Sequence, residues 1–310
     1  MPRSLPEDVV RMLAHLPELG SAARVAPTWR SWRWMVDCPG DQIAWIAEDD
    51  EGWARLRREG ELIATLAAAG CRVPRVIRVH EVARLQVRSR LPGISGYAAE
   101  DLVFGESVRV PAAVRYQDNS PLTEAGRALA RDLGAEIAAL HRAPVEEARS
   151  LGLPRTSYLT TLDQIERHLA RSALIRDFRT VVSRLRDWFA ALPDDPVIAL
   201  GDIQMHNLAV DPATGALVGV FDFDGAAVAH RLEDFKYLPS FGVAFTRVTL
   251  EAYSAAGGPP VGLDGVGQFH VLSALEHFTF VDDASPRWAE IIEWSHTALD
   301  RFPVRHREHS

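Results

Sequence analysis

The alternation of apolar and polar residues divides the chain into a strand-bearing first third and a helix-bearing remainder. Before residue 92, period-two alternation bounded by turn residues predicts short strands; beyond it, apolar residues recur at helical spacing. The strands are expected at 32–36, 43–46 and 84–91. The helices are expected at 52–69, 123–142, 157–174, 176–192, 244–255, 266–281 and 288–301, with one more beginning at Ser4.

This distribution predicts an α+β fold with two lobes. Pro92 and Gly93 break the last strand of the first part, which is typical of a hinge. We therefore place an N-terminal lobe at 1–91 and a larger, mainly helical lobe at 92–310. The stretch 94–120 shows no clear periodicity and is expected to be an irregular insertion, either a substrate lid or ordinary surface packing.

One carboxylate lies on the apolar face of the helix expected at 52–69. Leu56, Ile63 and Leu66 form that face, and Glu59 shares it. A carboxylate on a buried face needs a partner. Arg33, on a neighbouring predicted strand, is the candidate partner.

The most informative stretch begins with the apolar run 197–200, which ends in Gly201 and Asp202. Asn207 follows five positions later. The segment 211–215 predicts a tight hairpin turn, and the returning strand at 217–221 ends at Asp222. The hairpin would bring Asp222 back beside the loop that carries the other two side chains.

Carboxylate and amide oxygens are the ligands that Mg²⁺ prefers. In phosphoryl transfer one carboxylate orients the attacking hydroxyl and accepts its proton, while an amide and another carboxylate hold the metal ion. Asp202 is the candidate catalytic base, and Asn207 and Asp222 are the candidate metal ligands. The alternative is a structural turn, because Asp and Asn side chains also bond to their own backbone.

Composition narrows the possible partners. A formal net charge of −8 argues against nonspecific nucleic-acid binding, which needs a basic surface, and would suit a cationic small molecule. No apolar stretch is long enough to span a bilayer, and the first residues lack a signal-peptide pattern, so a cytoplasmic protein without a membrane partner is expected. Cys38 and Cys71 are expected to be reduced thiols.

The loop L-G-D-I-Q-M-H-N and the strand V-F-D-F-D resemble the aminoglycoside phosphotransferase and choline kinase group of small-molecule kinases. Their catalytic loop reads H-G-D-x-x-x-x-N and their metal strand I-D-F or I-D-W. Further matching pieces occur in family order at 58–63, 73–76, 90–93 and 133–144, the last containing L-H-x-x-P. The resemblance implies a protein-kinase-like fold, ATP or GTP as co-substrate, Mg²⁺, and a hydroxyl acceptor such as an aminoglycoside-like antibiotic, amino alcohol or sugar.

The resemblance also implies roles for individual residues. Glu59 corresponds to the helix glutamate of the small lobe, and Leu91, at the end of the strand before the hinge, lies on the nucleotide side. Asp234 would support the catalytic loop as a helix N-terminal cap, while His141 is expected to be a helix C-terminal cation or a packed residue. The C-terminal helices would carry the acceptor pocket, with substrate identity depending on Glu276, Asp282, Asp283, Trp288 and their neighbours.

Two departures from the family pattern bear on activity. The lysine or arginine that usually holds the nucleotide phosphates falls near Trp45, and no lysine precedes Lys236. Arg33 is the leading substitute, ahead of the arginines at 55, 57 and 58; Leu200 stands where the family has histidine. An active kinase and a pseudokinase, meaning a nucleotide- or metabolite-binding module without efficient catalysis, both remain open.

Overall fold

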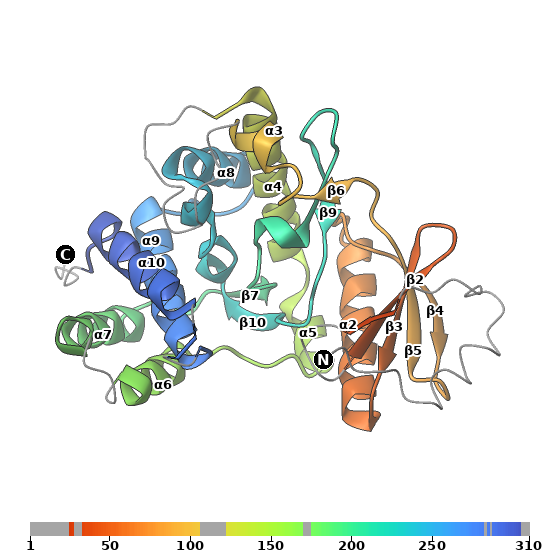
Figure 1. Ribbon diagram of the computed structural model, residues 1–310, viewed down its shortest axis with the longest axis horizontal. Coiled ribbons are helices and arrows are strands. Elements are labelled where there is room, and N and C mark those ends of the chain that lie inside the picture. Colours follow the sequence, from red (N-terminus) through yellow and green to blue (C-terminus); the bar gives the residue numbers. More distant parts are fainter. Residues whose placement is uncertain are drawn as a thin grey trace.

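The structure is a computed structural model that describes residues 25–27, 33–105, 122–169, 175–281, 284–285 and 287–304. Figure 1 shows a sheet with one long helix against it on one side of the molecule and a larger group of helices on the other. The expected α+β fold with a β-containing first part and a helical second part is confirmed. The helix expected to begin at Ser4 lies outside the described residues.

The N-terminal sheet is antiparallel, with strand order β1-β2-β3-β5-β4. Its strands are β1 (Val25–Pro27), β2 (Arg33–Cys38), β3 (Gln42–Ala47), β4 (Val76–His80) and β5 (Leu85–Ser89). Met35 lies opposite Trp45, and Trp45 lies opposite Gln86. Because side chains alternate along a strand, Arg33, Trp45 and Arg88 share the face that meets the long helix.

Helix α2 (Asp50–Ala68) covers this face of the sheet. Asp49 caps it, since its side chain accepts a hydrogen bond from the backbone N–H of Gly52 at 2.7 Å. The predicted buried face is confirmed, with Leu56, Glu59, Ile63 and Leu66 all buried. The helix thereby carries a carboxylate into the interior between itself and the sheet.

The chain crosses between the lobes after β5. Strand β6 (Ile94–Ser95) pairs with β8 (Leu208–Val210), and helix α3 (Glu100–Phe104) packs on the next long helix, so the first part of the expected irregular insertion is regular structure. The rest of it, from 106 to 120, lies outside the described residues. Gly93 has φ +100°, and a Cβ there would lie 2.4 Å from the carbonyl oxygen of Val210, so only glycine allows this close crossing.

The helical lobe is built around the contact between α4 and α8. Its helices are α4 (Glu124–Arg142), α5 (Val145–Ser150), α6 (Tyr158–Leu169), α7 (Ile175–Ala190), α8 (Val243–Ala255), α9 (Leu263–Glu276) and α10 (Arg287–Arg301). The two central helices approach closely at Gly134, where a Cβ would lie 2.3 Å from the carbonyl oxygen of Thr249. Within the described part of the chain, no helix has the length and apolar character needed to cross a membrane.

Candidate active site

The catalytic-loop segment connects two short strands at the base of the helical lobe. Strand β7 (Pro196–Ala199) pairs with β10 (Ala227–His230), and the chain then turns through Gly201 at φ +69°. A short 3₁₀ turn, η3 (Met205–Asn207), leads into strand β8 (Leu208–Val210). Asp202 lies in the loop between these strands, as the sequence predicted.

Asp202 and Asn207 are in direct contact. The Asn207 side-chain amide donates to the Asp202 backbone carbonyl and to its Oδ2, both at 2.9 Å. Gln204 donates to the other carboxylate oxygen, Oδ1. The carboxylate is therefore oriented from both sides, while its side chain keeps 30% exposure, so a ligand hydroxyl can still reach it.

The hairpin after the loop is formed as the sequence predicted. Strand β9 (Leu217–Val220) pairs with β8, and Asp211 accepts hydrogen bonds from the backbone of Ala213 and Thr214 in the turn. The N–H of Phe221 donates to the Asn207 carbonyl at 3.0 Å, which ties the returning strand to the loop. Asp222 follows at φ +66°, a left-handed conformation that is strained for a residue with a side chain.

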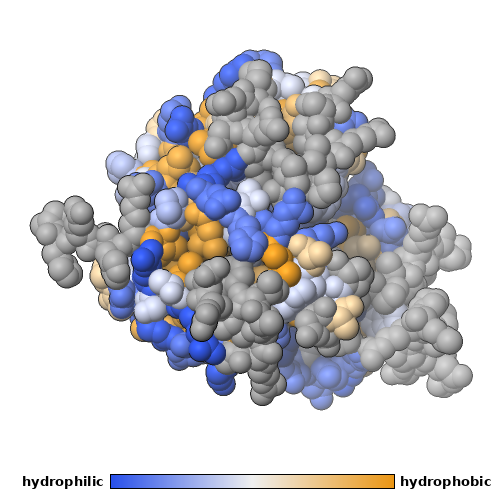
Figure 2. All heavy atoms as spheres, turned by 60° about the vertical axis from the view of Figure 1, so that its left-hand side comes forward, coloured by the Kyte–Doolittle hydropathy of each residue, from blue (hydrophilic) through white to orange (hydrophobic). Residues whose placement is uncertain are grey.

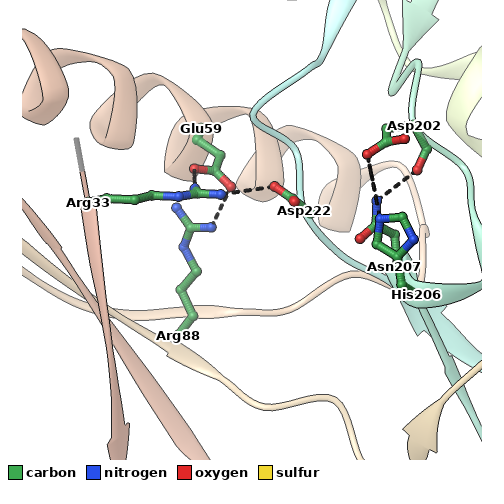
Figure 3. A network of polar contacts seen from close by, with 7 residues as sticks. All are labelled: Arg33, Glu59, Arg88, Asp202, His206, Asn207 and Asp222. Carbon is green, nitrogen blue, oxygen red and sulfur yellow. Dashed lines mark hydrogen bonds and ion pairs between the residues drawn. The ribbon is translucent and has the colours of Figure 1, made fainter. Parts of the chain in front are cut away.

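Asp222 belongs to a buried cluster of charges that joins the two parts of the molecule (Figure 3). Arg33 donates to Glu59 at 2.8 Å and to Asp222 at 2.9 Å, and its guanidinium carbon lies 4.4 Å from the ring centroid of Trp45. Arg88 donates to the other oxygen of Glu59 at 2.8 Å. Glu59 therefore joins two arginines from different strands.

The charges of this cluster set the ionisation of its carboxylate. Burial by itself would raise the pKa of Glu59, but Arg88 and Arg33 outweigh it and hold the pKa below its ordinary value. Burial likewise opposes the charge of Arg33, yet Glu59 and Asp222 keep the pKa of Arg33 raised. Glu59 and Arg33 are therefore both charged near neutral pH.

A cavity of about 330 Å³ lies beside this cluster, between the sheet and the strands of the larger lobe. That volume is in the range of small-molecule sites. The lining residues come from the sheet, from α2, from the crossing segment and from the hairpin. They include Met35, Ile43, Trp45, Glu59, Arg88, Leu91, Ile94 and Asp222.

The structure brings the predicted residues into two neighbouring groups. Glu59, Leu91 and Asp222 line the cavity; Arg33 does not line it but contacts three of its residues, Glu59, Asp222 and Trp45. Asp202 and Asn207 form the second group, and Figure 3 shows Asp222 lying between them and the arginine cluster. Sequence reasoning missed Arg88: alternation puts it on the same face as Gln86, but only the register between β3 and β5 puts that face beside Trp45.

The catalytic loop is supported from the helical lobe. Asp234 accepts a hydrogen bond from the Gly201 N–H at 2.8 Å, so it supports the loop directly and not, as expected, as a helix cap. The His141 ring lies 3.0 Å from the other Asp234 oxygen and 3.0 Å from the Tyr253 hydroxyl. His141 is therefore a packed residue whose hydrogen bonds position the carboxylate beneath the loop; its expected role as a helix C-terminal cation is not needed.

Several aromatic side chains lie near Asp202, and His206 Nε2 is 3.9 Å from its Oδ2. The rings of Tyr97 and His206 stack with centroids 5.5 Å apart. Burial raises the pKa of Tyr237, and the charge of Asp202 adds to that shift. Burial lowers the pKa of His277, and the charge of Asp202 opposes that shift.

The residues expected to set substrate identity lie in varied surroundings. Glu276 is half-buried, and burial raises its pKa against the opposing effect of Lys236, which pairs with Glu233. Trp288 packs on Phe278 within the helical lobe. Asp282 and Asp283 lie outside the described residues. Figure 2 shows this side of the molecule with apolar patches between polar side chains, and Phe280 is 71% exposed.

The predicted metal ligands can be tested against the chemistry of Mg²⁺. Asn207 uses its amide nitrogen within the loop, which leaves its oxygen available, and Asp222 supplies a carboxylate. No group of three or more His, Cys, Asp and Glu side chains among the described residues could hold a metal ion by itself. A few oxygen ligands suit Mg²⁺, which usually keeps water and takes phosphate oxygens, so the residues present fit this ion.

Comparison with models of known protein families shows to which family the chain belongs. Residues 40–269 match the model of the phosphotransferase enzyme family, APH. The chain belongs to this family. None of the curated proteins compared with it matched.

Solved structures of other phosphotransferases share the fold of this APH-family chain. The GDP complex of aminoglycoside 2'-phosphotransferase-IIIa superimposes with a TM-score of 0.71 at 16% identity, covering 96% of this chain and 99% of that one. Macrolide 2'-phosphotransferase MphH from Brachybacterium faecium, an apoenzyme, gives 0.63 at 19% identity, covering 97% and 100%. The streptomycin-ATP ternary complex of APH(2")-IIa gives 0.65 at 16%, covering 96% and 97%. At these identities the likeness shows the protein-kinase-like fold.

Proposed function

We propose that this phosphotransferase moves a phosphoryl group from a nucleoside triphosphate to a hydroxyl of a small molecule, with Mg²⁺ as the metal ion. The observation that carries the proposal is the oriented Asp202 carboxylate, held by Gln204 and Asn207, beside a cavity that is lined by Asp222 and Glu59. The nucleotide complexes of structurally similar phosphotransferases support it.

Each residue then has a defined task. Asp202 orients the acceptor hydroxyl and accepts its proton, because it is partly exposed and its direction is fixed by two side-chain amides. Asn207 and Asp222 would hold Mg²⁺, which would neutralise the charge of the phosphates. Leu91 and the apolar side chains of the cavity would contact the nucleotide base.

The acceptor would be a small molecule that reaches Asp202 from the aromatic side. Aminoglycoside-like compounds, amino alcohols and sugars offer suitable hydroxyls, and the half-buried Glu276 could receive a cationic group. Aminoglycoside and macrolide phosphotransferases are among the structural neighbours, which supports testing both antibiotic classes.

A two-stage experiment tests the function. Thermal unfolding with ATP, GTP and their diphosphates, each with and without Mg²⁺, should identify the nucleotide, because a ligand that binds the native state raises the unfolding temperature. Nucleotide consumption with an acceptor panel should then identify the substrate. Nucleotide binding without phosphorylation of any acceptor would instead favour the pseudokinase, which Trp45 at the position of the usual lysine keeps as the second candidate.

A further inference from the structure

Arg88 lines the cavity, but no functional role was expected for it from the sequence. It is on β5, opposite Ile43, and it lines the cavity together with Glu59 and Asp222. Its side chain is only 5% exposed. A guanidinium is always charged and offers only donors, so a buried one requires acceptors.

The partners of Arg88 do not match its charge. Glu59 accepts one hydrogen bond from Arg33 and one from Arg88, so a single carboxylate serves two cations. Arg33 has a second carboxylate partner in Asp222. Arg88 has instead the neutral Gln86 amide, whose oxygen accepts from its Nε at 2.6 Å, and its Nη2 is buried without a hydrogen-bond partner. A buried donor without an acceptor is destabilising.

A glycine in helix α2 leaves room for this arrangement. A Cβ at Gly60 would lie 2.0 Å from the side-chain nitrogen of Gln86, so the amide occupies space that a side chain at position 60 would take. Gln86 in turn fixes the direction of the Arg88 guanidinium. Gly60 therefore places a residue of low helix propensity inside α2, beside the Gln86 amide that contacts Arg88.

We propose that Arg88 is the cation that binds a phosphate group of the nucleotide, in place of the missing lysine, and that Arg33 positions Glu59 and Asp222. This inference rests on the proposed nucleotide-binding function. A lysine paired with one glutamate carries no net charge. Here two arginines share Glu59, and the second negative charge comes from Asp222. When Asp222 binds a metal ion instead, the two arginines and Glu59 together carry one positive charge. Phosphate oxygens are anionic acceptors that match a guanidinium in charge and geometry.

The experiment compares ligands that differ only in their phosphates. Calorimetry measures the affinity of the preferred nucleoside and of its mono-, di- and triphosphate, in EDTA and in Mg²⁺, for the wild type, Arg88→Gln and Arg88→Lys. The affinity of the wild type should rise from nucleoside to triphosphate. In Arg88→Gln this rise should be smaller by roughly 10- to 100-fold, while the affinity for the nucleoside is unchanged. Arg88→Lys should recover part of the loss, because the charge is kept.

Arg84→Gln is the matched control. Arg84 precedes the same strand, but it pairs with Asp50 at the surface and is not among the cavity residues. It should behave as the wild type. If Arg88→Gln failed to fold, the double variant Arg88→Gln with Glu59→Gln would replace it, because this variant removes the carboxylate together with its partner.

The outcomes distinguish failure of the Arg88 inference from failure of the proposed function. If each added phosphate raised the nucleotide affinity equally in the wild type and in Arg88→Gln, the inference would be overturned. An equal loss for nucleoside and triphosphate would also overturn it, since the arginine would then contact the base. A wild type that bound neither nucleoside nor nucleotide would overturn the proposed function itself.

Discussion

At the scale of single residues, Asp202 is the side chain on which the chemistry of the proposed reaction would depend most directly. We predict that Asp202→Asn lowers turnover by about 10²- to 10⁴-fold, because the amide cannot accept the acceptor proton. Nucleotide affinity should stay nearly unchanged, since Asp202 does not line the cavity. Steady-state kinetics and calorimetry on the same preparations measure the two effects. Wild-type turnover in the variant would rule Asp202 out as the base.

Asp222 should behave in the opposite way. It supplies a carboxylate at the boundary between the cavity and the catalytic loop, so Asp222→Ala should abolish the part of nucleotide affinity that depends on Mg²⁺. The measurement is calorimetric titration with nucleotide in the presence of Mg²⁺ and in EDTA. Asp211→Ala, at the exposed turn of the same hairpin, is the control. If Mg²⁺ strengthened nucleotide binding equally in Asp222→Ala and the wild type, the metal assignment would be wrong.

At the scale of elements, strand β2 and helix α2 each contribute an arginine whose surroundings differ sharply. The Arg33 side chain is 4% exposed and contacts Glu59 and Asp222, whereas that of Arg55 is 47% exposed and pairs with Glu51 one helical turn away. Arg33→Ala removes the cation that contacts both Glu59 and Asp222, two carboxylates that line the cavity. Arg55→Ala removes a surface ion pair, which contributes little.

Arg33→Ala should therefore weaken nucleotide binding by at least about tenfold, while Arg55→Ala should change it by less than about twofold. Calorimetry with the preferred nucleotide provides the comparison, and circular dichroism checks that each variant is folded. Equal affinities in the two variants would show that the cluster does not contribute to the nucleotide site.

The sequence predicted elements whose signals are local. The hairpin turn at 211–215 and the buried face of α2 depend on residues close together in the chain, and both are present. The position of Arg88 beside Glu59 was missed because it depends on the register between β3 and β5. Likewise, the hydrogen bonds from His141 to Asp234 and Tyr253 join residues about 100 positions apart, which periodicity does not reveal.

At the scale of the whole molecule, a buried histidine links the stability of the helical lobe to pH. His270 is 2% exposed; its Nδ1 lies 2.7 Å from the Lys236 carbonyl, and its Nε2 accepts from the Trp294 indole at 3.3 Å. Burial lowers the pKa of His270 to about 4. A second ring proton would face the indole N–H, so the neutral form fits this position.

Because the folded pKa lies below the unfolded value of 6.5, the unfolded chain binds the proton first as pH falls. The contribution of neutral His270 is complete above pH 6.5 and is lost progressively towards pH 4, by about 3 kcal/mol in total. Denaturant unfolding at several pH values should show a shallower decline for His270→Asn than for the wild type. His296→Asn, at an exposed position, should follow the wild-type slope.

The single lysine of the sequence, Lys236, is 12% exposed and pairs with Glu233 inside the helical lobe. Acylating reagents need a free, deprotonated amine, and neither the cavity nor the described surface offers a lysine amine. A nucleotide analogue that carries an amine-reactive acyl group should therefore leave this protein's side chains unmodified. Peptide mapping of the native and the unfolded chain should show Lys236 acylated only after unfolding, so an amine-reactive nucleotide label would not report nucleotide binding by this protein.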